Sequence, residues 1–433
     1  MTAPRTVGLA TCTSLVVANM VGTGIFTSLG FQVGEIPSRP AILVLWGLGG
    51  LLALCGALCY AELSAALPRS GGEYHFLGQI YHPALGFMAG VVSIVVGFAA
   101  PMALSAMAFG SYLHGLFPGV QPLAASVAVV VLVSLIHLHD LRLSSVFQIF
   151  FTGLKIALVL FLIAAFFNAP ASTPSAAAPW TDYMLTAPFA VSLMFTLYAY
   201  TGWNAATYIL GEVRTPGRII PFALAAGTLA VMALYLGLNA AMLHAAPAGA
   251  LAGQLNVAQV AAQGVFGQGG GRLVAGIIAL GLISSISAMA WAGPRVAMVI
   301  GEDHPHAFGW LRWRTAAGIP AAAVLGQSLL TLLLLFTSAF EQVLVYTQFS
   351  LLTCSFLTVS GVIVYRFTQP DLPRPFRVPL YPLTPLLFLA ISAFALIDTA
   401  AAKPSEALLG ALTLLGGLGI YAVVSRGKNR SGS

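Results

Sequence analysis

The chain has 433 residues, of which 59% are hydrophobic and only 7% are charged. Because soluble domains carry roughly 25% charged residues, this composition excludes a large soluble domain and indicates a protein that crosses a membrane many times. The net charge of +6 does not indicate nucleic-acid binding, since cationic loops that orient a chain in a membrane account for it.

The apolar runs define the expected membrane spans, because about 20 consecutive apolar residues cross a bilayer as a helix. On this criterion the sequence predicts an all-α polytopic membrane protein with twelve transmembrane helices. The first six cover residues 7–31, 41–67, 84–113, 122–138, 145–167 and 187–210. The last six cover residues 221–245, 272–300, 320–338, 342–367, 380–399 and 405–424.

The connections between these runs have characters of their own. Residues 68–77 combine a turn signal with a half-polar stretch, which predicts a short helix at the inner surface. Residues 246–271 are semi-polar and rich in glycine, and we expect short outer helices there. Residues 369–379 contain too many prolines for a helix and predict a stiff inner linker.

The distribution of positive charge predicts the orientation of the chain. With the N-terminus inside, fourteen of the 18 Lys and Arg residues fall in cytoplasmic segments, while Arg39, Arg272 and Lys403 fall in outer loops. The remaining cation, Lys155, lies within a span. The excess of inner positive charge favours an even number of spans with both termini cytoplasmic. We expect location in the plasma membrane, which is the inner membrane in a bacterium.

The first predicted span is interrupted in its middle by Ala18-Asn-Met-Val-Gly-Thr-Gly-Ile-Phe26, in which Gly22 and Gly24 flank Thr23. Backbone that leaves the helix at membrane depth is tolerated only where it is buried in protein or lines a cavity. A glycine-interrupted span that is matched in the second half of the chain indicates a transporter's binding site. We therefore expect this stretch to open a small-molecule site.

The matching stretch lies in the sixth predicted span, which contains Tyr198, Ala199, Thr201 and Gly202 halfway along its apolar run. Since this span is the fifth after the first, a repeat of five spans places the second copy upside down. We expect a single membrane transport domain over residues 1–433, with spans 1 and 6 broken at the midplane. Its parts are a first repeat at 7–167, an inverted repeat at 187–367 and two additional spans at 380–424.

The two breaks offer the two kinds of group that an amino acid requires. The half-helix after the first break offers the N–H groups of Thr23 and Gly24 to a carboxylate, with help from the helix dipole. Carbonyl oxygens freed at the breaks can accept from an ammonium group, and the candidates are Met20, Val21, Tyr198 and Thr201. The alternative is that the glycines only allow close helix packing. The second break, five spans later, favours the binding site.

Motifs along nearly the whole chain resemble those of the amino acid–polyamine–organocation superfamily, and within it the L-type amino acid transporters and their bacterial relatives. The motifs are Gly22-Thr-Gly-Ile-Phe26, Cys59-Tyr-Ala-Glu-Leu-Ser64, Pro68-Arg-Ser-Gly-Gly-Glu-Tyr74, Ala199-Tyr-Thr-Gly-Trp-Asn204, Gly211-Glu-Val-Arg-Thr-Pro216, Pro294-Arg-Val-Ala-Met-Val-Ile-Gly-Glu-Asp303 and Pro370-Asp-Leu-Pro-Arg-Pro-Phe-Arg-Val-Pro379. Each is weak alone, but their order and spacing together are specific.

This resemblance implies two inverted five-helix repeats with two further spans, and transport by alternating access. It assigns the carboxylate of the substrate to Gly22, Thr23 and Gly24, and the aromatic gate to Tyr198. The carbonyls for the amino group then belong to Met20, Tyr198 and Thr201. The chain has Thr23 where the family usually has Ser, and Thr201 where it often has Gly, which implies a smaller or differently shaped pocket. Residues 110–122 lack the Cys by which heteromeric relatives bind a partner subunit, so we expect no disulfide-linked partner.

Lys155 lies in the fifth span with apolar residues on both sides. An ionisable residue at this depth is a functional candidate, since insertion of a cation costs about 2.5–3.5 kcal/mol. Snorkelling to the inner interface is the alternative, but the reach is long from near the middle of the span. By resemblance, Lys155 stands where sodium-coupled relatives hold sodium. We expect it to bridge a carbonyl near Val17 or Ala18 and a hydroxyl at Ser284 or Ser287.

The remaining polar groups are interpreted as structural. Glu62 is expected to cap a helix or pair with an inner-loop Arg, and Glu212 to belong to an inner gate or a helix terminus. His137 and His139 lack neighbouring carboxylates or cysteines, so we expect no metal site and no cofactor. The cysteines all fall within spans and are expected to be packed: Cys12, Cys55, Cys59 and Cys354. No catalytic arrangement occurs at membrane depth, so the protein is not expected to be an enzyme.

The sequence therefore predicts sodium-independent transport of small to medium neutral L-amino acids, with the lipid bilayer and the amino acid as its partners. Neutral substrates are favoured because no carboxylate lies near the two breaks. Exchange and proton coupling both remain open, since burial of Lys155 makes proton release from it accessible. The alternatives are an antiporter for basic amino acids or polyamines and a sensor that binds without transport.

Overall fold

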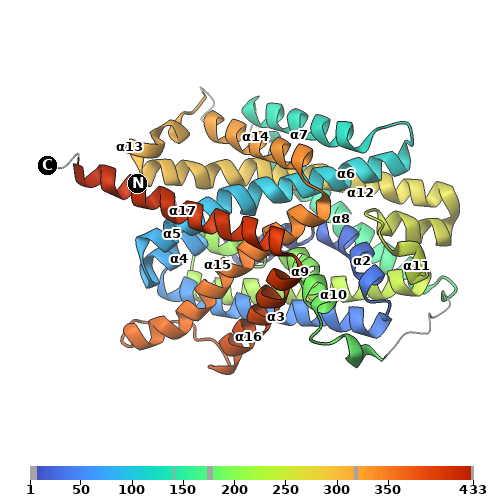
Figure 1. Cartoon of the computed structure of the whole chain (residues 1–433), viewed down its shortest axis with the longest axis horizontal. Coiled ribbons are helices and arrows are strands. Elements are labelled where there is room, and N and C mark those ends of the chain that lie inside the picture. The colour runs from blue at the N-terminus through green and yellow to red at the C-terminus, as the bar shows by residue number, and fades with distance from the viewer. Residues whose placement is uncertain (1–6, 140–141, 173–178, 316–319, 431–433) are drawn as a thin grey trace.

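The computed structural model describes residues 7–139, 142–172, 179–315 and 320–430, and gives side chains for these residues outside 139–149 and 426–430. The described residues are almost entirely helical (Figure 1). The only β pairing among them is one parallel bridge between Val7 and Val213. The predicted all-α class is confirmed.

Eight stretches of helix in the described residues are long and apolar enough to cross a membrane. They are Arg39–Ala66 (α3), Pro83–Leu116 (α5, η1 and α6), Phe150–Phe167 within α8 (Arg142–Phe167), Pro216–Ala245 (α10), Val257–Asp303 (α12), Phe340–Thr368 (α15), Leu383–Ala402 (α16) and Pro404–Ser425 within α17 (Pro404–Arg430). Each matches one predicted span.

The other four predicted spans correspond to broken or shorter helices. The first is a pair, α1 (Leu9–Met20) and α2 (Gly24–Glu35), which bends by 41° at its break. The sixth consists of α9 (Ala187–Tyr200) followed by the 3₁₀ helix η3 (Ala205–Glu212). The fourth and ninth are the shorter apolar helices α7 (Pro122–His139) and α14 (Ala321–Thr337).

Short elements occupy the connections. The predicted inner helix is α4 (Gly72–Ile80), and the proline-rich linker 369–379 contains no helix, as predicted. The outer segment forms α11 (Ala248–Leu251) and the beginning of α12, which is interrupted at Gly267 with φ of 71°. The remaining short helices are η2 (Trp180–Tyr183), α13 (Pro305–Phe308) and η4 (Gly309–Arg312).

The third span contains an irregularity that the sequence analysis did not predict. Between α5 (Pro83–Val92) and α6 (Ala100–Leu116) the chain forms a π-helix, η1 (Ser93–Ala99). Pro101 follows directly and has no N–H to continue the α-helical ladder, which accounts for the local change in hydrogen bonding.

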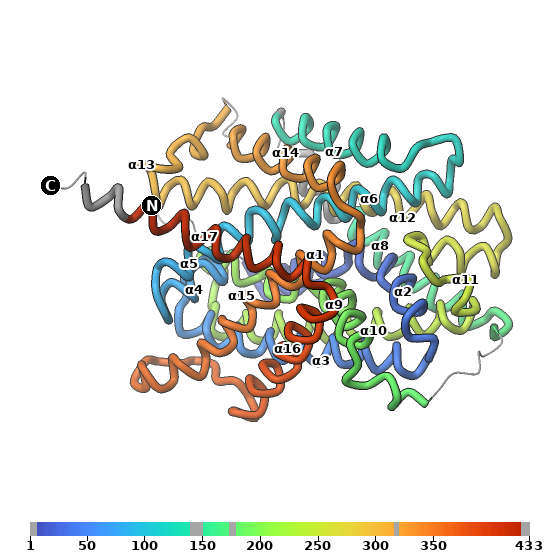
Figure 2. The backbone as a smooth tube through the Cα atoms, viewed as in Figure 1, coloured from blue at the N-terminus to red at the C-terminus, as the bar shows by residue number. Residues whose placement is uncertain are grey.

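The helices run mostly along the long axis of the molecule (Figure 1), and the N- and C-terminal marks lie toward the same end. α6, α7, α12 and α14 pack together, and α3 packs along α10. α1 and α2 lie in the interior between these groups (Figure 2), where α1 contacts α10 and α2 contacts α9. The first span is therefore surrounded by protein, as its broken backbone requires.

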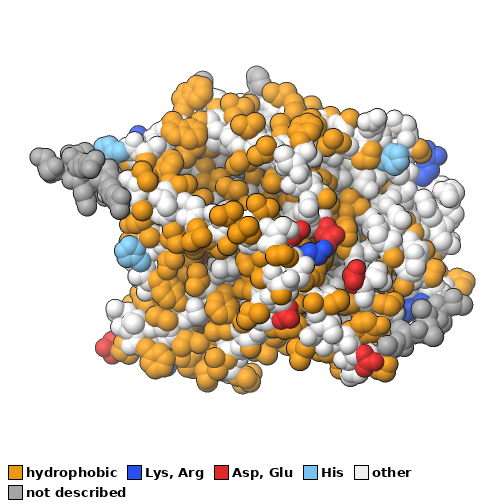
Figure 3. Space-filling model, in the orientation of Figure 1, with side chains coloured by type: hydrophobic (Ala, Val, Ile, Leu, Met, Phe, Trp, Pro, Cys, Tyr) orange, Lys and Arg blue, Asp and Glu red, His pale blue; other side chains and the backbone are white. Residues whose placement is uncertain are grey.

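The surface in Figure 3 is covered mainly by hydrophobic side chains, with charged residues at a few points. Leu329, Phe336 and Leu132 are more than half exposed and belong to helices that pack on one side only. Such large exposed apolar areas on a soluble protein mark an interaction surface. On this chain of apolar helices they are the surface that contacts lipid.

Candidate functional site

The first break exposes the beginning of α2. α1 ends at Met20, where the Val21 N–H donates to the Val17 carbonyl at 2.9 Å, and α2 begins at Gly24. The first N–H groups of a helix have no partner within it, and no side chain caps α2. The Thr23 hydroxyl instead lies 2.6 Å from that of Ser105 on α6. The N-terminus of α2 therefore has the features of an anion site.

The second break follows α9. Thr201 leaves the helix with ψ of 140°, and Gly202 adopts φ of 108°, a conformation that favours glycine. The Thr201 hydroxyl lies 3.2 Å from both the Leu197 carbonyl and the Gln348 side-chain oxygen on α15. The predicted break in the sixth span is confirmed.

The two breaks lie against each other. A Cβ atom added to Gly24 would be 2.5 Å from the Cα atom of Ala199, and one added to Gly202 would be 2.9 Å from the backbone carbon of Asn19. Real Cβ contacts are not this short, so each glycine allows one break to approach the backbone of the other. These glycines therefore allow close helix packing at the same place where the candidate site lies.

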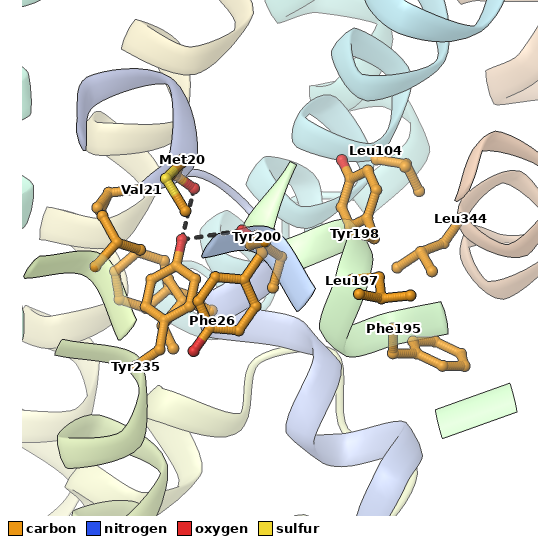
Figure 4. Packing of buried hydrophobic residues seen from close by; sticks show 14 of the residues in the cluster. Met20, Val21, Phe26, Leu104, Phe195, Leu197, Tyr198, Tyr200, Tyr235 and Leu344 are labelled. Carbon is orange, nitrogen blue, oxygen red and sulfur yellow. Dashed lines mark hydrogen bonds between the residues drawn. The ribbon is translucent and has the colours of Figure 1, made fainter. Parts of the chain in front are cut away.

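Tyr235 on α10 joins the two breaks. Its buried hydroxyl lies 2.5 Å from the Met20 carbonyl oxygen and 3.1 Å from that of Ala199. Figure 4 shows this hydroxyl between the end of α1 and the end of α9. One phenol thus stabilises two carbonyls that the breaks remove from regular helix hydrogen bonding.

Three of the four carbonyls expected to receive an ammonium group already accept hydrogen bonds. Met20 accepts from Tyr235, Val21 accepts from Lys155 at 2.9 Å, and Tyr198 accepts from the Thr201 N–H at 3.0 Å. Each carbonyl oxygen has a second lone pair, so an ammonium group would share rather than replace these partners.

Tyr198 lies on the opposite side of α9 from Tyr235, near Leu104 and Leu344 (Figure 4). The ring is buried, and its hydroxyl has no hydrogen-bond partner among the described residues. An aromatic side chain that is packed but not fixed by its hydroxyl is able to change rotamer, as the gate implied by the resemblance would require.

Gly22 marks open space beside the breaks. It is partly exposed, whereas Val21, Thr23 and Gly24 are buried. A Cβ atom at Gly22 would meet only the Met20 carbonyl oxygen, at 3.8 Å. Among the predicted site residues in the first break, Gly22 is therefore the one with room for a ligand atom.

Lys155 on α8 reaches the first break, which confirms its buried position. Only 3% of the residue is exposed, and its ammonium group donates to the Val21 carbonyl at 2.9 Å and the Ser285 hydroxyl on α12 at 3.2 Å. A charged donor on a carbonyl without a helical partner holds the unwound backbone in place. Lys155 thereby links α8, α12 and the break.

The expected partners of Lys155 were wrong in register. The carbonyl is that of Val21 rather than Val17 or Ala18, because the Val17 carbonyl is still engaged within α1 by the Val21 N–H. The hydroxyl is that of Ser285 rather than Ser284 or Ser287. Ser287 instead lies 2.9 Å from His137 Nε2.

The half-helices α2 and α9 are joined by polar contacts. The Gln32 amide nitrogen donates to the Ser192 carbonyl at 3.0 Å and the Thr196 hydroxyl at 2.8 Å, and its oxygen accepts from Trp46 Nε1 at 2.9 Å. The N–H of Gly253, after α11, donates to the Gly30 carbonyl at 2.9 Å and covers this pair. These contacts make α2 and α9 one unit.

The chain on the other side of the breaks is also joined in a pair. Val7, before α1, bonds through its backbone to the Glu212 carbonyl at 3.0 Å and the Arg214 N–H at 3.1 Å. This bridge connects the beginning of span 1 to the end of span 6. The predicted placement of Glu212 at a helix terminus is confirmed, because η3 ends there.

Glu62 on α3 holds the end of α15 and the proline-rich linker. Its carboxylate forms two hydrogen bonds with Arg366, at 2.8 and 2.5 Å, and accepts the Val378 N–H at 2.6 Å. Arg374 lies 3.6 Å away. The prediction that Glu62 pairs with an arginine is confirmed.

Sequence reasoning missed four residues that shape the breaks: Ser105, Tyr235, Ser285 and Gln348. Each is a polar side chain within a long apolar span, and each is buried. Their polarity in an apolar span is the signal in the sequence, since a buried polar group requires a partner. The identity of the partner depends on helix rotation and could not be read from the chain.

A surface cleft of about 580 Å³ lies away from the breaks, between the start of α10 and the linker. Its lining includes Arg214, Arg218, Phe222 and Phe376, and none of the predicted substrate residues. Because it opens to the surface and lacks the paired donors and acceptors of the breaks, we do not assign the substrate to it.

Comparisons with known proteins agree with the geometry. A model of the amino acid permease family matches residues 7–418. The chain is 28% identical over 429 residues to the b(0,+)-type amino acid transporter 1 of Homo sapiens, covering 96% of this chain and 87% of the relative. It is 26% identical over 424 residues to the serine/threonine exchanger SteT of Bacillus subtilis, covering 96% of both. It is 28% identical over 438 residues to the large neutral amino acids transporter small subunit 2 of Mus musculus, covering 96% and 80%.

Proposed function

Because this chain belongs to the amino acid permease family, we propose that it carries small to medium neutral L-amino acids across the membrane by alternating access, without sodium. The observation that carries this proposal is the meeting of two helix breaks, with Gly24 against Ala199 and Gly202 against Asn19. An uncapped helix start and unwound carbonyls are thereby brought to one place, and an amino acid presents the matching carboxylate and ammonium groups.

The carboxylate would bind at the start of α2, next to Gly22. The N–H groups of Thr23 and Gly24 are the donors, and the dipole of the 12-residue helix favours a negative charge there. The ammonium group would share carbonyls at the ends of α1 and α9, with Thr201 and Met20 as the nearest candidates. Tyr198 would close over the side chain of the substrate.

Neutral substrates suit the described surroundings of the breaks. Lys155 is the charged side chain in hydrogen-bond contact with the described residues of the breaks; Ser105, Tyr235 and Gln348, which also contact them, are uncharged. A cationic substrate side chain would therefore find no carboxylate here and would lose its hydration. The names of the serine/threonine and large neutral amino acid relatives agree with this preference.

Lys155 supports sodium independence. Its ammonium group supplies a positive charge at the Val21 carbonyl, and a sodium ion needs several such oxygens free of other cations. A covalently attached cation can perform the same bridging between the broken span and α12. Exchange of amino acids and proton-coupled uptake are both compatible with a lysine in this role.

During transport, helix segments that are joined by hydrogen bonds would move together as pairs. α2 and α9 share the Gln32 contacts, while the start of α1 and the end of η3 share the Val7 bridge. Tilting one pair away from the remaining helices opens the site to one side of the membrane, and tilting the other opens it to the opposite side. Both termini would be cytoplasmic, in the plasma membrane or a bacterial inner membrane.

Counterflow in proteoliposomes tests this proposal. Vesicles loaded with unlabelled L-serine or L-leucine should accumulate the same labelled amino acid equally in sodium and choline buffers. L-arginine and putrescine, offered in parallel, should be poor substrates. Uptake only with L-arginine or putrescine would replace the neutral assignment, and binding in a thermal-shift assay without flux would indicate a sensor.

A further inference from the structure

Glu73 is a buried carboxyl group outside the proposed substrate site. It lies on the inner helix α4, and only 4% of the residue is exposed. The Tyr60 hydroxyl on α3 donates to it, and the Ser355 hydroxyl on α15 donates to the same oxygen at 3.0 Å. The carboxyl group therefore connects α4 to two transmembrane helices.

Among the described residues, the groups that face Glu73 carry no positive charge. α3 contributes Tyr60, α15 contributes Ser355 and Cys354, and η3 contributes Tyr208, while α5 has no titratable residue. On α4 itself, burial and the charge of Arg69 lower the pKa of His75 to about 4, so this ring is neutral near pH 7.

Charged groups near this end of the helices are engaged with partners other than Glu73. Arg366 and Arg374 lie against Glu62, and the Tyr74 hydroxyl of α4 donates to Asp303 at 2.6 Å. A charged Glu73 would thus be a buried anion without a cation, an arrangement that proteins avoid by keeping the proton. Burial raises the pKa of Glu73, and the hydrogen bonds from Tyr60 and Ser355 only partly offset this.

The cluster can also hold the carboxyl group in its protonated form. It can donate one hydrogen bond and accept another, and the hydroxyls of Tyr60 and Ser355 can each take either role. Water would solvate the carboxylate if α4 separated from α3 and α15, so the proton would then leave at an ordinary carboxyl pKa.

The position of α4 couples this cluster to the second break. A Cβ atom added to Gly72 would lie 2.6 Å from the ring of Tyr208 on η3, so the start of α4 packs directly on that segment. η3 is the half-helix that follows the break at Gly202. Movement of η3 therefore changes the packing around Glu73.

We propose that Glu73 is a proton-binding site of the inner gate, protonated while α4, α3, α15 and η3 are packed together and deprotonated when they separate. This inference rests on the proposed transport function for its physiological meaning. It differs from a role for Lys155, because the proton is bound at the inner end of the helices and not beside the substrate.

The direction of the pH dependence follows by linkage. The packed state binds the proton more tightly than the open state, so acid favours packing. As the pH rises through the raised pKa of the packed state, this contribution to packing is lost. The population open at the inner end then increases up to tenfold for each unit by which the two pKa values differ.

Cys354 provides a reporter, since its thiol is fully buried next to Ser355. The purified protein would be treated with N-ethylmaleimide between pH 5 and pH 8, and peptide mass spectrometry would give the alkylation rate of Cys354. Dividing the rate in the wild-type protein by that in Glu73→Gln at each pH leaves only the effects of the Glu73 charge. A negative charge on Glu73 disfavours the nearby Cys354 thiolate, so this direct effect lowers the ratio as the pH rises and cannot produce an increase. We expect this ratio to rise from pH 5 to pH 8, by up to tenfold for each unit by which the two pKa values of Glu73 differ.

Glu341→Gln is the matched control, because Glu341 pairs with Lys403 at 2.8 Å and both are partly exposed. It should keep the wild-type pH dependence. If Glu73→Gln does not fold, the ratio of Cys354 to Cys55 alkylation in the wild type should rise in the same way. A ratio that is flat with pH overturns the proton site, even if counterflow succeeds. A rising ratio without any counterflow would support the proton site and reject the transport proposal.

Discussion

Replacing Lys155 by Met removes the ammonium group but keeps most of the apolar volume of the side chain. Two hydrogen bonds are lost, to the Val21 carbonyl at 2.9 Å and the Ser285 hydroxyl at 3.2 Å. A hydrogen bond to a charged group contributes roughly 1.5–3 kcal/mol. Because 1.36 kcal/mol is a factor of ten, loss of one such bond from the transport-competent break corresponds to about 10- to 150-fold.

We therefore expect Lys155→Met to reduce counterflow of the wild-type substrate to about a tenth or less. Thermal stability should change less, since the substitution also removes the desolvation of a buried cation. Lys403→Met is the matched control, because Lys403 is more than a third exposed and pairs with Glu341 near the surface. Initial rates in proteoliposomes at equal protein density measure the effect. Wild-type counterflow by Lys155→Met would refute the role of the lysine.

Three further substitutions test the site and its support. Gly22→Ala should leave the melting temperature unchanged, because there is room for the methyl group. It should weaken substrate affinity by about tenfold if that room holds the carboxylate. Gly153→Ala, which also places its methyl group in open space, is the control, and thermal-shift titrations measure both affinities. Glu62→Gln should lower the free energy of unfolding by less than the roughly 3–5 kcal/mol of a fully buried pair, because Arg366 is partly exposed, and chemical denaturation measures this loss. Tyr235→Phe should lower the melting temperature modestly, since an unpaired buried carbonyl costs about 1–3 kcal/mol, and should slow counterflow more than it weakens binding.

The membrane spans were predictable because lipid imposes a simple rule on length and polarity. Apolar runs of about 20 residues mark the spans regardless of tertiary contacts. The outer segment was harder, because residues 257–271 are semi-polar and yet continue into α12 with one irregularity at Gly267. The π-helix at 93–99 depends on how the ladder adjusts near Pro101, which no periodicity reveals.

The breaks were predictable for a different reason. Gly22, Gly24 and Gly202 interrupt apolar runs where a lipid-facing helix would carry larger residues. The hydrogen-bond partners of Lys155 could not be predicted, because adjacent residues on a helix differ by about 100° in direction. A one-residue error therefore exchanges Ser284 for Ser285, and only the packing of α8 on α12 decides between them.

The role of α10 in supporting the breaks could not be predicted from the sequence. Tyr235 is the one tyrosine in a 30-residue apolar helix. Its importance follows from its distance to Met20 and Ala199, which lie 215 and 36 positions away in the chain. Long-range contacts of this kind require coordinates.

The most direct measurement is a structure determined with a neutral amino acid that gives counterflow. We expect its carboxylate within about 3 Å of the N–H groups of Thr23 and Gly24, the distance of a charge-assisted hydrogen bond, with its ammonium group near Thr201. Density for the amino acid in another part of the molecule, with the space beside Gly22 empty, would contradict binding at the meeting of the two broken helices.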